Sequence, residues 1–446
     1  MPKPSITTTM LHKNRIAVDQ ALARISDTEG QGSRTFTRVY ADAARLAADT
    51  ADAMGGLGLE QPPLSGVLVS VKDLFDLKGE VTLAGSRALM DSTPADQDAE
   101  VVRRLRCAGA AIIGKTNMTE FAFSGLGLNP HYGTPLNSWD RAGARIPGGS
   151  SSGAAISITD GMAQAAIGTD TGGSCRIPAA LNGIVGMKPS AQSVPMAGAF
   201  PLSYSYDSIG PMAADVEMCA RVYAVLCNGP YLLERIDPCS ITLGIVGNYV
   251  LDGMDATVGR AYESALQRLS RAGVAVRELT LPVLDELPSL FTNGGLVAAE
   301  AYQRHRELLE AREAEYDPRV SSRIRRGAAI SSADYIDLKQ LRHRLMEEWS
   351  SQTRGRQMVL MPTVPVVAPK ISDLNDDEAY QKANLLMLRN PTIANALNGC
   401  SVSIPCHDSG EAPVGLMLMG ANGNDWRLLS IAQALEEILK ACRSPH

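Results

Sequence analysis

Two glycine- and serine-rich turns, separated by a run of small and apolar residues, constrain this chain more than any other feature. The stretch 148–176 reads GGSSSGAAISITDGMAQAAIGTDTGGSCR. Residues such as Ala165, Ala166 and Ile167 pack tightly in an interior, whereas a solvated linker has no reason to carry them. Glycine lets a backbone approach a ligand closely. The stretch therefore predicts a buried site built from two turns.

The second turn, residues 168–176, surrounds one hydroxyl with consecutive backbone N–H groups. Donors that converge on one point are what the oxyanion of a tetrahedral intermediate requires. An isolated Gly/Ser cluster is more often a plain turn, but two clusters around a packed run favour a site. The hydroxyl is that of Ser174, and the expected donors are the amides of Thr171, Gly172, Gly173 and Ser174.

A candidate base lies at the end of a strongly apolar segment. Residues 66–73, GVLVSVKD, are apolar on both faces, which is typical of a central strand in a covered sheet. A charged Lys72 would be costly to bury there unless it were paired. Two interpretations stay open: an ion pair with Asp73 or Asp76, or a neutral lysine, its pKa lowered by desolvation, that acts as a general base.

Histidine offers no evident partner for a serine nucleophile. Four of the six histidines fall in expected surface helices or at the terminus, and two fall in loops without a Gly-x-Ser-x-Gly motif. They are His12, His305, His343, His446, His131 and His407. Lysine replaces histidine in known Ser–Lys arrangements, so Lys72 is the best candidate base. Within the second turn, Asp170 and Arg176 are expected to pair and stiffen it, and Cys175 to be a packed thiol.

These motifs resemble those of the amidase signature family of serine hydrolases. The resemblance extends over about residues 12–440 and includes VKD at 71–73, GKTNMTEF at 114–121, PGGSSSG at 147–153, GTDTGGSCR at 168–176, GMKP at 186–189, DSIGPMA at 207–213, MPT at 361–363 and PVGL at 413–416. It implies that Ser174 is the acylated nucleophile, Ser150 the bridging serine after a cis Gly149–Ser150 peptide, and Lys72 the terminal base. The activity that it implies is amide hydrolysis through an acyl-enzyme.

Alternating strand and helix patterns predict an α/β fold. We expect one large domain with a central mixed β-sheet covered on both faces by helices, as in the amidase signature fold. Residues 1–65 are expected to form an N-terminal helical cover, and residues 66–446 the catalytic domain, with its signature core at about 66–215. Expected strands include 66–73, 111–114, 184–186, 241–246, 274–276 and 358–362, and residues 296–350 are expected to be strongly helical, with Ser331 or Ser332 as a cap.

Composition excludes several classes of partner. The chain has 446 residues, 45% of them hydrophobic and 20% charged, as in an ordinary globular protein. A net charge of −6 argues against nucleic acid as a main partner. The absence of a long apolar run or an apolar leader argues against a membrane and for the cytoplasm. Eight scattered cysteines without a CxxC pair read as reduced thiols. No metal and no cofactor is expected.

Two arginines bear on which amide is cleaved. In the A subunit of glutamyl-tRNA amidotransferase, the position of Arg389 carries an acidic residue, and an arginine there favours a carboxylate over an ammonium. Arg323 is a second candidate anion contact, although both arginines are also compatible with structural pairing. By resemblance, Phe123, Ser124 and Tyr204 are further candidate substrate contacts.

The function expected from the residues and the resemblance together is hydrolysis of a small amide, one that carries a carboxylate, to a carboxylic acid and ammonia or an amine. The alternative is a glutamine-hydrolysing A subunit of a tRNA-dependent amidotransferase complex, which delivers ammonia to a partner. A homodimer or a small accessory subunit is compatible with either function.

Overall fold

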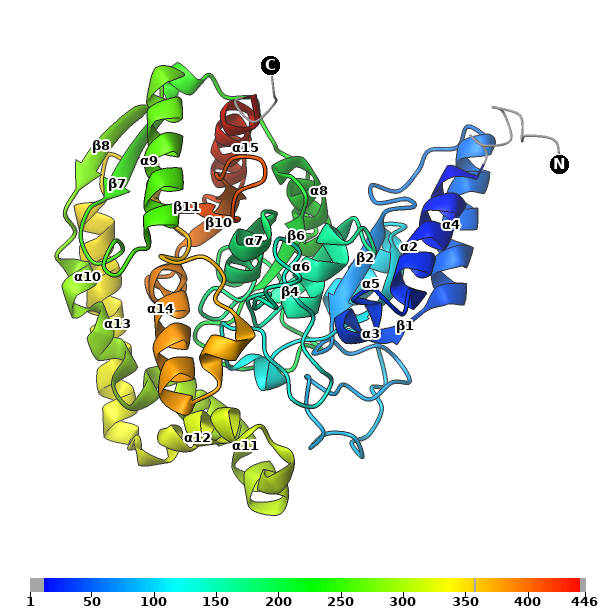
Figure 1. Cartoon of the computed structure of the whole chain (residues 1–446), viewed down its shortest axis with the longest axis horizontal. Helices are drawn as coiled ribbons and strands as arrows, with labels where there is room; N and C mark the ends of the chain where they lie inside the picture. Colours follow the sequence, from blue (N-terminus) through cyan, green and yellow to red (C-terminus); the bar gives the residue numbers. More distant parts are fainter. Residues whose placement is uncertain (1–11, 357, 442–446) are drawn as a thin grey trace.

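The computed structural model describes residues 12–356 and 358–441, and its centre is an eleven-stranded mixed sheet (Figure 1). The strands lie in the order β1-β3-β2-β4-β6-β5-β10-β11-β9-β7-β8. Their bounds are β1 Phe36–Val39, β2 Leu68–Lys72, β3 Ala111–Thr116, β4 Ala165–Thr169, β5 Val185–Lys188, β6 Ile209–Ala213, β7 Thr242–Val246, β8 Ala275–Leu279, β9 Met358–Pro362, β10 Cys400–Pro405 and β11 Gly415–Gly420.

Parallel pairs occupy two separate regions of this sheet. Strand β2 runs parallel to β3 and β4, and β7 runs parallel to β8 and β9. Between these regions, from β4 to β9, neighbouring strands are antiparallel. Strands β2, β3 and β4 are buried throughout, as expected for parallel strands covered on both faces. The predicted mixed α/β sheet is confirmed.

Helices flank the sheet along its whole length (Figure 1). Helices α8 and α9 both contact α15, whereas α6 contacts α7, which contacts α14. The bounds of the α-helices are α2 Lys13–Ser26, α3 Gly32–Thr35, α4 Ala41–Gly56, α5 Glu100–Cys107, α6 Ser152–Thr159, α7 Arg176–Asn182, α8 Val216–Cys227, α9 Ala256–Arg271, α10 Val283–Glu286, α11 Gly295–Arg312, α12 Pro318–Arg325, α13 Ser332–Gln352, α14 Asp377–Ala396 and α15 Asp425–Ala441.

The N-terminal segment both covers and extends the sheet. Helices α2 and α4 pack together, and α4 contacts β3. Between them, β1 pairs antiparallel with β3 at the edge of the sheet, so the described part of the expected helical cover is not wholly helical. Four residues, FTRV, carry too little hydrophobic periodicity to distinguish this edge strand from the helices beside it. Residues 1–11 of the expected cover lie outside the described residues.

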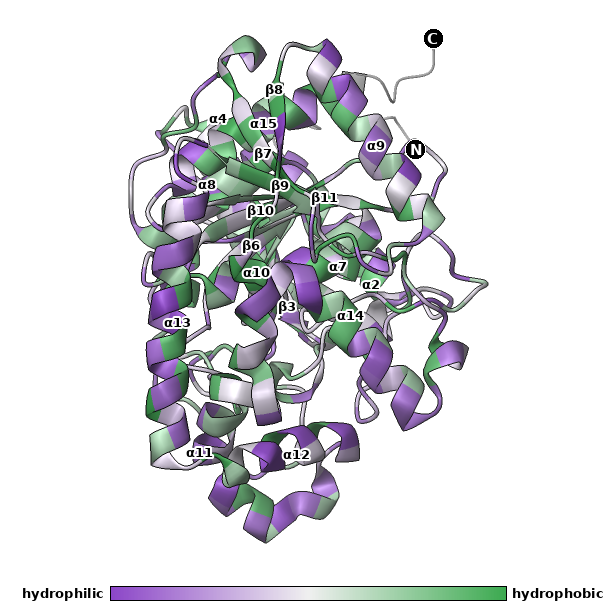
Figure 2. Ribbon diagram, turned by 90° about the vertical axis from the view of Figure 1, so that its left-hand side faces the viewer, coloured by the Kyte–Doolittle hydropathy of each residue, from purple (hydrophilic) through white to green (hydrophobic). Residues whose placement is uncertain are grey.

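The helical region after β8 is divided more finely than its composition predicts. Ser331 caps α13, and its side chain and that of Asp334 form a reciprocal capping box. The acidic run 373–377, whose composition predicts a solvated loop, instead contains Asp376, which caps the N-terminus of α14. In Figure 2, the strands are largely hydrophobic, whereas α12 and α13 carry hydrophilic residues.

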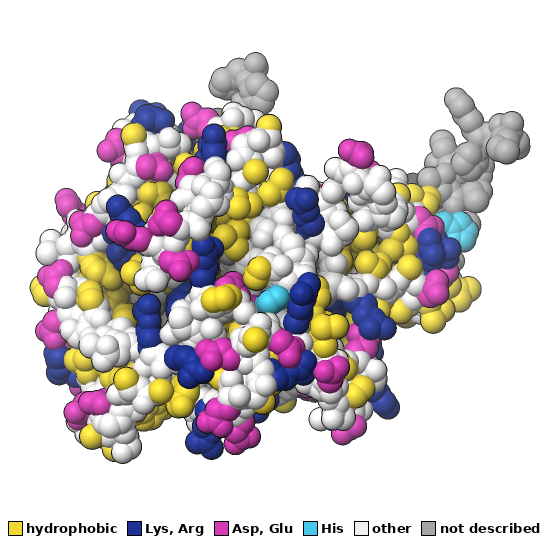
Figure 3. Space-filling view, turned by 60° about the horizontal axis from the view of Figure 1, so that its bottom comes forward, with side chains coloured by type: hydrophobic (Ala, Val, Ile, Leu, Met, Phe, Trp, Pro, Cys, Tyr) yellow, Lys and Arg dark blue, Asp and Glu magenta, His cyan; other side chains and the backbone are white. Residues whose placement is uncertain are grey.

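Charges of both signs are interspersed on the face shown in Figure 3, as on an ordinary solvated surface. Among the described residues, none of the helices is both long enough and apolar enough to cross a bilayer.

Candidate active site

The carboxyl ends of two adjacent parallel strands bring a lysine and two hydroxyls together. Lys72 ends β2 and Thr169 ends β4, its neighbour in the sheet. Lys72 is fully buried, and its Nζ donates hydrogen bonds to Ser150 Oγ at 2.7 Å and to Thr169 Oγ1 at 2.9 Å. The edge where parallel strands end is where α/β sheets commonly place their ligand sites.

Lys72 has no carboxylate partner within ion-pair distance among the described residues. Asp73 lies 3.3 Å from Lys115 instead, and Asp76 accepts a hydrogen bond from Thr82 Oγ1 at 2.6 Å. The interpretation of Lys72 as half of a structural ion pair is therefore wrong. Burial lowers the pKa of Lys72 from 10.5 to about 8, although the nearby Cys175, Asp207 and Asp170 raise it.

The first glycine-rich turn holds Ser150 by its backbone. The Gly149–Ser150 peptide is cis, as the resemblance implies. Gly149 N–H donates to Gly125 C=O at 2.8 Å, and Ser150 C=O accepts from Thr119 N–H at 3.1 Å. A Cβ on Gly149 would lie 2.6 Å from the backbone nitrogen of Gly127, so only glycine fits this approach. Ser150 is thus fixed between two backbone segments.

The second turn is organised around a buried ion pair. Arg176 donates to both carboxylate oxygens of Asp170, at 2.8 and 3.0 Å, and both side chains are fully buried. Burial alone would raise the pKa of Asp170, but Arg176 and Asn395 lower it to about 2. Gly173 N–H and Cys175 N–H also donate to Asp170, at 2.9 and 3.1 Å. The expected Asp170–Arg176 pair is present and orients the turn.

The turn leaves three N–H groups unused. Those of Thr171, Gly172 and Ser174 donate no hydrogen bond within the described part of the chain, whereas Gly173 N–H is occupied by Asp170. Thr171 Oγ1 donates to Asp207 at 2.5 Å, and Thr392 Oγ1 donates to Gly172 C=O at 3.2 Å. These side-chain contacts fix the turn from outside while its free N–H groups stay available.

Ser174 faces the cavity described below and lies beside the first turn. Its carbonyl accepts from Ser151 N–H at 3.3 Å, so the two turns touch at Ser174 itself and at the residue after Ser150. Among the described residues, no hydrogen bond joins Ser174 Oγ to Ser150 Oγ, and Ser174 is one of the residues that line the cavity. Cys175, next to it, is buried, and burial raises the pKa of its thiol to about 12.

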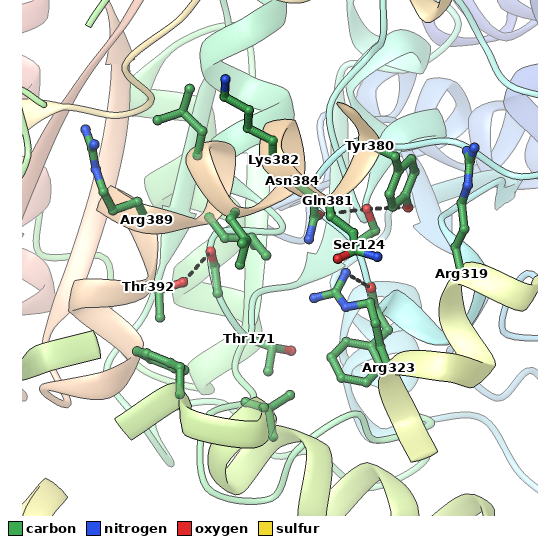
Figure 4. Close-up of a pocket in the computed structure, with 18 of the residues that line it drawn as sticks. Ser124, Thr171, Arg319, Arg323, Tyr380, Gln381, Lys382, Asn384, Arg389 and Thr392 are labelled. Atoms are coloured by element: carbon green, nitrogen blue, oxygen red, sulfur yellow. Dashed lines mark hydrogen bonds between the residues drawn. The ribbon is translucent and has the colours of Figure 1, made fainter. Parts of the chain in front are cut away.

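A cavity of about 1330 Å³ opens in front of the second turn. Helices α12 and α14 and the loop after β3 supply one part of its wall (Figure 4). There Arg323 donates to Phe123 C=O at 2.6 Å, and its guanidinium lies 4.6 Å from the centroid of the Phe123 ring. Ser124 Oγ donates to Asn384 Oδ1 at 2.9 Å and accepts from the Tyr380 hydroxyl at 2.8 Å.

Arg323 is one of several cavity-lining cations, with Arg326, Lys382 and Arg389, that have no ion-pair partner among the described residues. No carboxylate lies within ion-pair distance of it in the described part of the structure, whereas Arg319, one turn earlier, pairs with Asp377 at 2.9 Å. Burial lowers the pKa of Arg323 to about 10, so it stays protonated at neutral pH.

Two other predicted substrate contacts, Arg389 and Tyr204, are less well placed to meet a ligand. Arg389 lines the cavity, but it donates to Asp252 C=O at 2.5 Å and to Val250 C=O at 2.8 Å, and in Figure 4 its guanidinium points away from Arg323. Tyr204 is 67% exposed and is not among the cavity-lining residues. Its position after Phe200 in the sequence gave no information on the direction of its side chain.

Apart from Arg389, sequence reasoning missed the cavity-lining side chains of α14. Four of them recur every four residues on one face of the helix, and this spacing is the signal that would have found them. These four are Tyr380, Asn384, Leu388 and Thr392.

No histidine lines the cavity among the described residues. His305, expected on a surface helix, is 1% exposed and packs against Phe121, Phe200 and Tyr316. Burial lowers the pKa of His305 to about 4. The described residues also contain no group of three or more His, Cys, Asp or Glu side chains arranged to hold a metal ion.

Comparisons with known proteins identify the family to which the chain belongs. Residues 17–429 match the family model described as Amidase. The chain is 36% identical to 2-amino-5-chloromuconic acid deaminase of Comamonas testosteroni, over 89% of this chain and 86% of that protein. It is 33% identical to the A subunit of the glutamyl-tRNA(Gln) amidotransferase of Anaeromyxobacter sp. (strain K), over 96% and 93% respectively.

Solved structures give the same result. A crystal structure of an amidase superposes with a TM-score of 0.86 at 32% identity and covers 97% of this chain and 99% of its own. The peptide amidase of Stenotrophomonas maltophilia superposes with a TM-score of 0.79 at 25% identity, over 99% and 97% respectively. The chain therefore belongs to the amidase signature family and is a hydrolase of carbon–nitrogen amide bonds.

Proposed function

We propose that Lys72, Ser150 and Ser174 form the catalytic relay, with Ser174 as the nucleophile. The observation that carries this proposal is the 2.7 Å contact between Lys72 Nζ and Ser150 Oγ at a fully buried lysine without a counterion. A lysine with a pKa of about 8 is neutral in about a tenth of molecules at pH 7, against about 0.03% for a lysine at 10.5. It is therefore a competent base near neutral pH.

In the acylation step, neutral Lys72 takes a proton from Ser150 while Ser150 takes one from Ser174. The Ser174 oxygen then forms a bond to the amide carbon. Hydrogen bonds between catalytic groups are often long before substrate binds, so we expect the Ser150–Ser174 contact to shorten in the complex. Collapse of the intermediate breaks the C–N bond, and the relay returns its proton to the departing nitrogen.

In the deacylation step, water attacks the Ser174 ester and gives its proton to the same relay. The C–O bond to Ser174 breaks, Ser174 regains a proton and the carboxylic acid leaves. In both steps, the oxyanion would be held by the free N–H groups of Thr171, Gly172 and Ser174. We omit Gly173 from this set because its N–H donates to Asp170. Removing one such donor typically costs about 3 kcal/mol of transition-state stabilisation.

We further propose that the substrate carries a carboxylate, which Arg323 binds. An uncompensated arginine in a wall that is otherwise hydrogen-bonded is suited to a carboxylate. Arg389 is the weaker candidate because backbone carbonyls already accept from its guanidinium. The relative from Comamonas testosteroni supports this choice, because its name gives an amino-substituted acid as the substrate.

The second candidate function is glutamine hydrolysis as the A subunit of an amidotransferase. It is favoured by the 33% identity to such subunits over nearly the whole chain. Against it, Arg323 and Arg389 line the cavity and would repel the α-ammonium group of glutamine where it lies beside them, although the carboxylates of Asp252, Asp317 and Asp377 line the cavity as well.

One experiment tests both functions. The purified chain is sized in solution to detect a homodimer or a small accessory subunit, and is assayed for ammonia release from succinamate, butyramide and glutamine. Ser174→Ala serves as the blank. We expect Ser174-dependent turnover of succinamate by the chain alone, with an acyl adduct of Ser174 visible by intact mass. Turnover of glutamine that requires an added subunit would favour the second function, and turnover by Ser174→Ala would refute the proposed nucleophile.

A further inference from the structure

The cavity has two chemically different sides that flank the second turn. What we call the polar side consists of hydrogen-bonding and cationic side chains, namely Ser124, Arg323, Tyr380 and Asn384. What we call the apolar side contains four aliphatic and aromatic side chains, Leu202, Tyr249, Phe291 and Val297, with the Arg389 guanidinium over the Tyr249 ring. A pocket of this kind places a few polar groups to fix orientation and uses apolar surface for the rest of the ligand.

The apolar side is held by its own packing. Tyr249, Phe291 and Val297 pack against one hydrophobic cluster, whereas Tyr380, on the polar side, belongs to another. Leu202 adjoins the second turn because Asp207 accepts from both Leu202 N–H, at 2.9 Å, and Thr171 Oγ1, at 2.5 Å. These side chains are therefore fixed in place beside the turn.

Helix α14 indicates how the two sides lie relative to the turn. Asn384 belongs to the polar side, and Thr392, eight residues later, bonds to Gly172 of the turn. At 1.5 Å per residue, this separation is about 12 Å. Figure 4 places Arg323 on one side of Thr171 and Arg389 on the other, and Tyr249 lies under the Arg389 guanidinium at 5.7 Å. In this view Thr171 of the turn thus lies between Arg323, on the polar side, and Arg389, which lies over Tyr249 of the apolar side.

We propose that the substrate is an N-substituted amide with a carboxylate on one side of the scissile bond and a phenyl-sized apolar group on the other. This inference rests on the proposed function and narrows it from small amides in general. The volume supports it, because about 1330 Å³ exceeds the usual 300–1,000 Å³ of a small-ligand pocket and far exceeds what a primary amide fills.

The test uses matched amides with the wild-type chain. Succinanilic acid and N-benzoyl-β-alanine carry both groups, in the two possible orientations, whereas succinamate lacks the apolar group and butyranilide lacks the carboxylate. We expect kcat/KM for at least one doubly substituted amide to exceed that for succinamate and for butyranilide by about tenfold or more, as filling an apolar pocket typically gives. Equal or faster turnover of succinamate would overturn the inference.

Variants then assign each preference to its side of the cavity. Val297→Phe, which fills the apolar side, and Phe291→Ala, which removes part of it, should both lower the ratio of kcat/KM for the doubly substituted amide to that for succinamate. Arg323→Gln should lower the ratio of kcat/KM for the doubly substituted amide to kcat/KM for butyranilide. Leu46→Phe, at a 69% exposed position on α4, is the matched control and should change neither ratio.

The two levels of proposal fail in different ways. If no amide is hydrolysed, or if Ser174→Ala remains active, the proposed function fails. If turnover depends on Ser174 but the ratios in Val297→Phe and Phe291→Ala equal those of the wild type, only the inference about the N-substituent fails. Melting temperatures of each variant show whether it is folded.

Discussion

Replacing Lys72 with methionine should abolish activity and stabilise the protein at neutral pH. Methionine is close in length to the lysine stem and fills the same buried space without a charge. Lys72 Nζ has no counterion and bonds only to two hydroxyls. The substitution therefore removes the cost of a buried ammonium and, with it, the general base.

The size of the effect on stability follows from the pKa of Lys72. Burial lowers this pKa from 10.5 to about 8. Since each pKa unit corresponds to about 1.4 kcal/mol, keeping Lys72 charged in the fold costs about 3 kcal/mol at pH 7. Between pH 8 and 10.5 the unfolded chain binds more protons than the native one, so this cost falls as pH rises, to about 1 kcal/mol at pH 9.5. Two lost hydrogen bonds cost about 2 kcal/mol at either pH.

The variant should therefore be about 1 kcal/mol more stable than the wild type at pH 7 and about 1 kcal/mol less stable at pH 9.5. Urea titrations at both pH values measure this, and the other ionisable groups cancel in the difference between variant and wild type. Lys188→Met is the matched control. Lys188 is also buried with its pKa lowered to about 8, and it donates only to the carbonyls of Pro189 and Gly399.

Lys188→Met should show the same pH trend in stability and lose far less activity than Lys72→Met. A stability difference for Lys72→Met that is the same at pH 7 and pH 9.5 would refute the reasoning from burial. Amide turnover by Lys72→Met within tenfold of the wild type would refute the role of Lys72 as base.

Three further predictions follow from the same geometry. The kcat/KM for succinamate, measured by stopped assays of ammonia release, should rise through about pH 8, as Lys72 loses its proton, and level off above it. A fall in kcat/KM over this range would contradict the role of Lys72 as the general base. Asp170→Asn should destabilise the fold by about 3–5 kcal/mol, measured by urea titration, because Arg176 would remain buried without a counterion. Iodoacetamide at pH 7.5 should alkylate exposed thiols but spare Cys175, as peptide mass mapping would show, because the Cys175 thiol is buried and its pKa is raised to about 12.

The sequence predicted those parts of the fold where hydrophobicity is extreme. Residues 66–73 are apolar on both faces, and the structure places β2 within them, in the middle of the parallel region. Residues 358–362 were predicted as a strand and match β9. In both cases burial on two faces leaves a continuous apolar run, which a single sequence reveals without knowledge of its neighbours.

Other elements depend on partners that are distant in the sequence. Strand β1 is recognisable only because β3 pairs with it. The direction of Arg389 depends on the carbonyls of Val250 and Asp252, about 140 residues away, so the residue type alone suggested an anion contact that backbone acceptors largely satisfy.

The chemistry and the selectivity of this site are therefore encoded in different ways. The proposed reacting groups come from short motifs, and the resemblance of these motifs to those of the family is what implied their roles. The cavity walls come from η3 (Leu287–Gly294), α12 and α14, where single side chains face inward at helical intervals and no motif marks them. Under the proposed function, a substitution at Val297 or Arg323 should change which substrates bind and leave the Lys72–Ser150 contact in place. Members of one family can therefore keep one bond-breaking arrangement while their substrates diverge.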